Sequence, residues 1–212
     1  MTMLRLYDNL ISGNGYKVRL FLTQLGLPFE RVELDVFNGE TRTRQFLARS
    51  PNGRIPTLRL EDGSYLAESN AILCYLAEDS RFWPVERKAR AETLQWLFFE
   101  QYSHEPYIAV LRFWAHLSEL TALQQGERPG RKARDEAALG VMERHLGTRS
   151  FFVGERYGVA DIALYAYTHV AEEGGFDLAP YPAIRSWLAR VAAQPNHAAI
   201  TAEVGLRPAD AA

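Results

Sequence analysis

Two short segments contain residues whose types and spacing suit the binding of a peptide. In the first, Ile55 precedes Pro56 and a short predicted strand. Proline fixes its own φ angle and lacks an N–H group, and an X-Pro bond adopts the cis form far more readily than other peptide bonds do. A cis bond here would turn the N–H and C=O groups of Ile55 outward, where an extended peptide pairs with them as an added strand.

The second segment is Glu68-Ser69, at the predicted start of a helix. The first N–H groups of a helix have no partner within the helix, so this end attracts carboxylates. The ordinary alternative is that Pro56 ends a loop and Ser69 only caps the helix. The ordered combination of a proline edge, a hairpin and Glu68-Ser69 favours peptide binding, because a motif gains weight from its structural context.

This combination resembles the glutathione-binding site of the glutathione transferases, and the resemblance extends from Met3 to about Asn196. It implies a thioredoxin-like first domain, an all-helical second domain, a homodimer, and glutathione as the co-substrate without any metal. Arg54 and Asn38 are looser matches, for the glycyl end of glutathione. The positions that match the peptide-holding residues of the family are Ile55, Pro56, Glu68 and Ser69.

A loop of small polar residues, Ser12 to Gly15, precedes the first predicted helix. Transferase chemistry needs a thiolate, whereas a free thiol has a pKa of about 8.5 that helix N-termini lower. One charge-assisted hydrogen bond, worth about 1.5–3 kcal/mol, shifts a pKa by about one or two units. The loop is similar to that of the serine- and threonine-using bacterial classes, the nu class above all. This resemblance implies that Ser12 and Asn14 stabilise the thiolate; the alternative is that both are turn residues.

Two other interpretations of this region are weaker. The tyrosine-using classes of the family have a tyrosine near the position of Tyr7, but the Ser12 loop is the more specific match. Gly13 and Gly15 imitate a dinucleotide-binding fingerprint, yet Val18 occupies the position of its third glycine. A hairpin predicted soon afterwards also disagrees with a doubly wound sheet, so we expect no nucleotide cofactor.

The first 80 residues have a β-α-β-α-β-β-α pattern, in which Glu61-Asp62-Gly63 marks the hairpin. Two strands joined by a helix and followed by an antiparallel pair are typical of the thioredoxin-like fold. We therefore expect a thioredoxin-like α/β domain at 1–80, an all-α domain at 86–205 and a loose tail at 207–212. Long helical segments are predicted at 87–118, 131–147, 158–173 and 182–193, with breaks at 126–130 and 147–158.

The helical domain contains few residues with reactive side chains. His104 and Tyr107 lie on the helix that faces the thiol in this family, so they are candidates for the acceptor pocket; the alternative for His104 is a packing or surface role. Gly158 and Asp161 fit a capping box that lacks its hydroxyl half, which is a folding motif. Cys74, in the first domain, is predicted to be a small buried hydrophobe.

The composition is that of an ordinary globular protein, with 47% hydrophobic and 24% charged residues. A net charge of -2 without a long run of one sign gives no indication of nucleic acid or an anionic membrane as a partner. The single cysteine fits a reducing compartment, and the start of the chain has no leader-like apolar run. We therefore expect a cytoplasmic protein. The histidines share no metal-ligand spacing, so the sequence does not predict a metal site.

The resemblance leads to a predicted function, the conjugation of the glutathione thiolate to small electrophiles. Two alternatives stay open: a glutathione-dependent disulfide or peroxide reductase, in which two glutathiones supply both sulfurs, and a non-catalytic binding module of the same fold. The aromatic residues in 91–103 follow one another closely, and one helix face cannot bury them all. The apolar surface left over agrees with the homodimer that the resemblance implies.

Overall fold

The computed structural model describes residues 3–205, so the tail predicted at 207–212 lies outside the described residues. The described chain divides into two compact units, 3–80 together with 195–205, and Arg81–Gln194. The sequence-based boundary of 86–205 had included the segment 195–205 in the helical domain. Its contacts join it to the first unit, where the hydroxyl of Tyr16 donates to the carbonyl oxygen of Ala198 at 2.7 Å.

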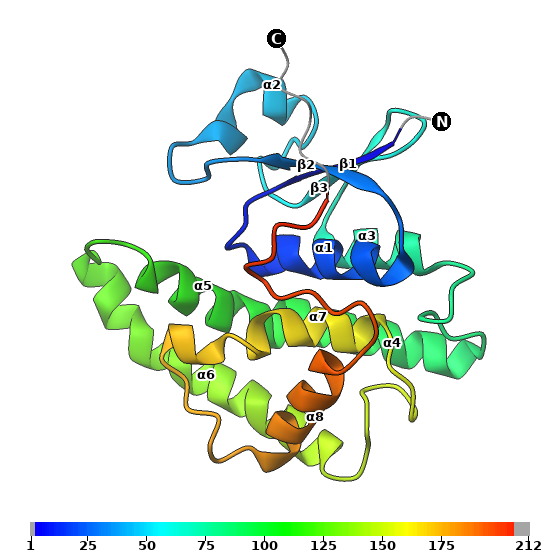
Figure 1. Ribbon diagram of the computed structural model, residues 1–212. Coiled ribbons are helices and arrows are strands. Elements are labelled where there is room, and N and C mark those ends of the chain that lie inside the picture. The colour runs from blue at the N-terminus through cyan, green and yellow to red at the C-terminus, as the bar shows by residue number, and fades with distance from the viewer. Residues whose placement is uncertain (1–2, 206–212) are drawn as a thin grey trace. The chain divides into compact units, whose positions relative to one another are not determined.

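The first unit contains a four-stranded mixed sheet of the order β2-β1-β3-β4. Strands β1 (Leu4–Asp8) and β2 (Phe29–Glu33) are parallel, and β3 (Thr57–Arg59) pairs antiparallel with both β1 and β4 (Tyr65–Ala67). Helices α1 (Gly13–Leu25) and α3 (Ser69–Ala77) lie side by side against one face of the sheet, and α2 (Arg44–Leu47) lies on the other side (Figure 1). The predicted thioredoxin-like fold class is confirmed.

The pleat of β1 explains why both faces of this sheet are covered. Successive side chains of a strand point to opposite faces, and Leu6 packs with α1 and α3 while Tyr7 packs with Phe46 of α2. Burial of such side chains is worth roughly 1.5–3 kcal/mol each. The core cluster between the sheet and the two long helices consists of Leu4, Leu6, Val18, Leu22, Phe29, Leu58 and Ile72.

The described residues of the second unit form helices and connecting loops, with no strand among them. Its long helices are α4 (Arg87–Phe99), α5 (Glu105–Ala115), α6 (Ala122–Leu146), α7 (Val159–Thr168) and α8 (Pro182–Ala192). In this unit α5 and α8 both pack on α6, and α7 packs on α4, α5 and α8 (Figure 1). The predicted all-α second domain is confirmed, and α7 begins with the expected capping box, because the Asp161 carboxylate accepts the N–H of Gly158 at 3.0 Å.

The helix α6 corrects one sequence-based boundary, because no break occurs at 126–130. The helix begins nine residues earlier than predicted, where Thr121 and Gln124 form a reciprocal capping box. This box satisfies otherwise unpaired N–H groups of the first turn, so a helix forms despite Gly126 and Pro129. The local signal from glycine and proline was therefore outweighed by a cap and by packing against α5.

A π-helical turn, Glu100–His104, separates α4 from α5 where the sequence predicted one continuous helix. Pro106 lies in the first turn of α5. Proline lacks the N–H that an uninterrupted helix would need and its ring clashes with the preceding turn, so the backbone widens before it. His104 is the last residue of this irregular turn.

Candidate glutathione site

Ser12 is the N-cap of α1. Its Oγ accepts the N–H of Gly15 at 3.1 Å, and its backbone is extended with φ -68° and ψ 120°. A serine hydroxyl has one proton and two lone pairs, so a cap that uses one lone pair leaves the O–H able to donate elsewhere. The cap and a hydrogen bond to a ligand are therefore compatible.

The end of β1 lies directly against the first turn of α1. A Cβ atom at Gly15 would come within 1.5 Å of the Asp8 carboxylate, so only glycine fits this close approach. Asp8 pairs with Arg19 at 2.9 Å, and both side chains are buried. Burial raises the pKa of Asp8 to about 7, and Arg19 opposes that shift. Arg19 also donates to the carbonyl of Leu10 at 2.7 Å, so it holds the loop and is not available for a ligand carboxylate.

The Ile55-Pro56 peptide bond is cis, which confirms the sequence-based expectation. Pro56 is buried and Ile55 is half-buried immediately before β3. Two hydroxyl groups hold the preceding turn, because Ser50 and Thr57 donate to the carbonyl of Arg54 at 3.2 and 3.1 Å. The side chain of Arg54 itself is exposed.

At the start of α3, Glu68 has a positive φ of 67°. A non-glycine residue rarely adopts this conformation, and such outliers cluster at functional sites. The next residue, Ser69, is buried and its hydroxyl donates to Oδ1 of Asn14 at 3.2 Å. The fold thereby brings together two predicted site residues that lie 55 positions apart.

A third member of this cluster was given no role by the sequence analysis. Lys17 is fully buried, and its ammonium donates to Ser69 Oγ at 3.3 Å and to Asn70 Oδ1 at 3.5 Å. In the segment Tyr16-Lys17-Val18 the lysine stands between two apolar residues, and all three are buried. A charged residue within an apolar helix face was the signal available in the sequence.

Other selected residues lie outside this cluster. Asn38 is exposed and bonds Asp35 through its backbone N–H at 3.0 Å and its side-chain amide at 2.6 Å, and these bonds lower the pKa of Asp35. Tyr7 is buried between Phe46 and Tyr65. Cys74 is partly buried, and burial raises the pKa of its thiol to about 11, so it is protonated at neutral pH.

The two acceptor-pocket candidates of the helical unit have different environments. His104 is fully buried, with Nδ1 at 2.8 Å from Asp135 and Nε2 at 3.0 Å from the Thr168 hydroxyl, so its contacts favour the packing alternative. Tyr107 is half-buried and Arg134 donates to its hydroxyl at 3.4 Å. It lines a hollow of about 360 Å³ together with Gly126, Glu127, Gly130, Arg131 and Arg134.

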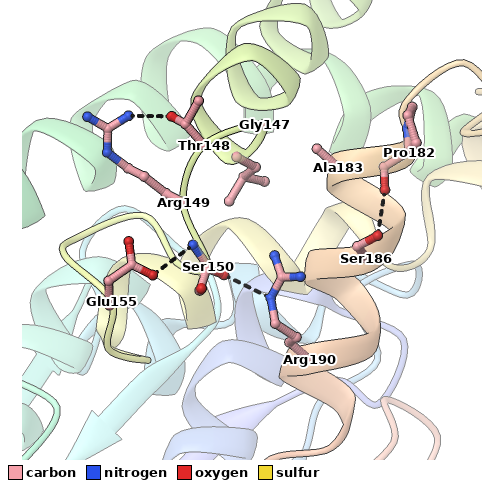
Figure 2. A pocket seen from close by; sticks show the side chains of 10 residues that line it. Gly147, Thr148, Arg149, Ser150, Glu155, Pro182, Ala183, Ser186 and Arg190 are labelled. Atoms are coloured by element: carbon pink, nitrogen blue, oxygen red, sulfur yellow. Dashed lines mark hydrogen bonds between the residues drawn. The ribbon is translucent and has the colours of Figure 1, made fainter.

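Figure 2 shows a second hollow of the helical unit, beside the loop that follows α6 and the helix α8. Within it Arg190 donates to the carbonyl of Ser150 at 3.0 Å, and Glu155 accepts the N–H of Ser150 at 3.2 Å. The charged groups thus hold the loop in place. The hollow measures about 400 Å³ and is lined by Leu146, Gly147, Thr148, Arg149, Ser150, Glu155, Pro182, Ala183, Ser186 and Arg190.

Within residues 3–205, no group of three or more histidine, cysteine or acidic side chains is arranged to hold a metal ion. None of the helices in this part of the chain is long and apolar enough to cross a membrane.

Comparison with known proteins agrees with the fold. The family models for the glutathione S-transferase N-terminal and C-terminal domains match residues 11–79 and 123–195. A solved structure of a glutathione S-transferase from Pseudomonas fluorescens is 51% identical, with a TM-score of 0.91 over 94% of this chain and 99% of that one. The chain belongs to the glutathione S-transferase family.

Three further relatives bear on function. The disulfide-bond oxidoreductase YfcG of Escherichia coli is 32% identical over 91% of this chain and 93% of its own length. A glutathione transferase from Burkholderia graminis, solved with two glutathione molecules bound per subunit, is 28% identical with a TM-score of 0.80 over 92% of this chain and 85% of that one. The chain spans only 44% of elongation factor 1-gamma of Carassius auratus, to which it is 30% identical.

Proposed function

We propose that this protein is a glutathione transferase that joins the glutathione thiolate to small electrophiles. The observation that carries the proposal is the contact between Asn14 and Ser69, which unites the first turns of α1 and α3. The N-cap Ser12 and the cis Ile55-Pro56 bond belong to the same unit. Helix N-termini favour anions, and glutathione offers two: a γ-glutamyl carboxylate and a thiolate.

In the proposed complex, the γ-glutamyl carboxylate lies at the N-terminus of α3, beside Glu68 and Ser69, and the cysteinyl backbone pairs with Ile55. Arg54 and Asn38 are the proposed contacts of the glycyl end. The Ser12 hydroxyl and the Asn14 amide donate to the sulfur. Each unit by which they lower the thiol pKa is worth about 1.36 kcal/mol.

The chemical step needs no further protein group. The thiol loses its proton to solvent, the thiolate attacks an electrophilic carbon, and a carbon–sulfur bond forms as a leaving group such as chloride departs with the bonding electrons. The protein contributes orientation and electrostatic stabilisation. For the acceptor we propose the hollow at Tyr107; His104, the other candidate, supports it only by holding the helices.

The likeness to YfcG favours a second candidate function, the reduction of disulfides or peroxides by glutathione. In that reaction the bound thiolate attacks the glutathionyl sulfur of a mixed disulfide of glutathione and another thiol, glutathione disulfide forms, and the released thiolate takes up a proton. The same site serves both reactions because each begins with the glutathione thiolate. The likeness to elongation factor 1-gamma keeps a non-catalytic binding module as the third candidate.

Binding calorimetry and two assays of the purified protein separate the three candidates. A transferase turns over a chloronitroarene with glutathione, and a reductase turns over glutathione with a hydroxyethyl mixed disulfide. Binding without either activity favours the binding module, and a protein that binds no glutathione refutes the proposal. Ser69→Ala should weaken glutathione binding by about 1.5–3 kcal/mol, because it removes the hydroxyl that accepts from the Lys17 ammonium and donates to Asn14.

We propose in addition a cytoplasmic homodimer. Support for a dimer comes from apolar side chains along α4 and the following turn, where Leu94, Phe98 and Tyr102 are 39%, 69% and 82% exposed. Exposed apolar patches usually mark partner surfaces. Static light scattering at micromolar concentration should give twice the 24.1 kDa of one chain; a monomer contradicts this proposal.

A further inference from the structure

Lys17 is a fully buried lysine at the contact between α1 and α3. Removing an ammonium from water is unfavourable unless polar partners replace its hydration. A methionine of similar length would fill the same space without that cost. The groups that Lys17 contacts therefore indicate what the charge contributes.

The hydrogen bonds that lead from Lys17 to Asn14 have a fixed direction. An ammonium only donates, so Ser69 Oγ accepts from Lys17 at 3.3 Å. The hydroxyl proton of Ser69 is then directed at Oδ1 of Asn14, 3.2 Å away. Because its oxygen accepts from Ser69, the end of the Asn14 amide that donates is its NH2 group.

We propose that Lys17 is a positioning residue for glutathione, which acts through Ser69 on Asn14. The inference rests on the proposed glutathione site and adds a residue to it. The charge of Lys17 orients both hydrogen bonds so that Asn14 presents its NH2 group, and not its oxygen, to the glutathione sulfur.

The charge has a second consequence for the same ligand. The ammonium of Lys17 lies next to the hydroxyl of Ser69, the first residue of α3, so its positive charge adds to the positive end of that helix. In a buried environment a charge acts more strongly than it does in water. The ligand carboxylate at this end is therefore favoured together with the thiolate.

The test compares Lys17→Met with Lys88→Met, which removes the same charge from an exposed position on α4. Isothermal titration gives the dissociation constant for glutathione, and the pH dependence of thiolate absorbance gives the pKa of the bound thiol. We expect Lys17→Met to raise the dissociation constant about tenfold and the thiol pKa by about one unit, since one unit is a factor of ten. Lys88→Met should change neither.

A double-mutant cycle with Ser69→Ala tests whether Lys17 acts through Ser69. If it does, Lys17→Met changes the thiol pKa by much less in the Ser69→Ala background than in the unaltered protein, because coupled residues are not additive. Fully additive shifts, or a normal thiol pKa in folded Lys17→Met, overturn the inference. A merely structural lysine changes the unfolding midpoint without moving the thiol pKa.

Two more variants cover the case in which Lys17→Met does not fold. Lys17→Gln keeps an N–H donor without the charge, and Lys17→Arg keeps both. We expect the thiol pKa to rise in the glutamine variant and to stay within a few tenths of a unit of normal in the arginine variant; equal values in the two overturn the inference. If the unaltered protein binds no glutathione, the proposed function itself fails, which is a different result.

Discussion

The two units bury polar side chains in different surroundings. In the first unit, Lys17 and Ser69 form hydrogen bonds that lead to the half-buried Asn14, at the first turns of two helices. In the helical unit, the bonds of His104 lead to Asp135 and Thr168, which are themselves fully buried.

The difference indicates how to distinguish a binding site from a structural network. Both arrangements satisfy buried polar groups, which would otherwise be costly. Only the first ends at a partly exposed side chain, because Asn14 is half-buried whereas Asp135 and Thr168 are fully buried. Burial of a polar residue alone is therefore weak evidence of function, and the end point of its hydrogen bonds is stronger evidence.

The largest effect should follow from Asp161→Ala in the helical unit. The Asp161 carboxylate accepts hydrogen bonds from the Trp187 indole at 2.9 Å, from the N–H of Phe152 at 3.1 Å and from the N–H of Gly158. Two of these donors would be buried without a partner, at about 1–3 kcal/mol each. We expect a loss of about 4 kcal/mol in the free energy of unfolding, measured with urea.

If the buried hydrogen bonds of the helical unit are purely structural, the folded Asp161→Ala variant should bind glutathione with normal affinity. Glu136→Gln, at an exposed position of α6, is the control and should change neither quantity. A large loss of affinity in the folded variant would show that the helical network also serves the ligand.

His104→Phe should destabilise the protein by about 3 kcal/mol, because it leaves the Asp135 carboxylate buried without its partner. The Michaelis constant for the acceptor should stay normal, since the ring is fully buried. Unfolding by urea and steady-state kinetics measure the two quantities. A several-fold rise in the Michaelis constant at unchanged stability would restore His104 to the acceptor pocket.

Ser12→Ala should raise the pKa of the bound thiol by about one or two units, the value of one charge-assisted hydrogen bond. The same change removes the N-cap of α1, which costs about 1 kcal/mol of stability. Ser12→Gly separates the effects, because glycine costs only a few tenths of a kcal/mol at an N-cap yet also lacks the hydroxyl.

Both Ser12 variants should therefore share the shift in thiolate absorbance, while only alanine lowers the unfolding midpoint clearly. Tyr7→Phe and Cys74→Ala are the controls and should leave the titration unchanged. A shift in Tyr7→Phe but not in the Ser12 variants would place the protein among the tyrosine users.

The smallest effect should come from Tyr107→Phe, which removes one exposed hydrogen bond to Arg134. We expect the Michaelis constant for the acceptor to rise about fivefold, or about 1 kcal/mol, with the glutathione affinity unchanged. Phe113→Leu, which alters an exposed aromatic side chain of the same helix, is the control. If the two variants behave alike, Tyr107 has no special place in the acceptor site.

The sequence alone determined the fold class and supplied most of the residues of the proposed site. Alternation, helical periodicity and the hairpin signal are local properties, so they predicted β1 to α3 in the right order. The dipeptides Ile55-Pro56 and Glu68-Ser69 were also recognisable, because the cis bond and the helix start depend on residues that are adjacent in the chain.

The tertiary structure decided which of these residues meet. Lys17 and Ser69 are 52 positions apart, and only the packing of α1 against α3 brings the ammonium to the hydroxyl. The tertiary structure also brings Asp8 close to Gly15, and no local sequence signal predicts this close approach. Packing likewise buried His104, and packing against α5 together with the Thr121 cap continued α6 through Gly126 and Pro129. Local patterns fix the conformation of neighbours, whereas burial and long-range contacts depend on the whole fold, because they are set by what each side chain meets after collapse.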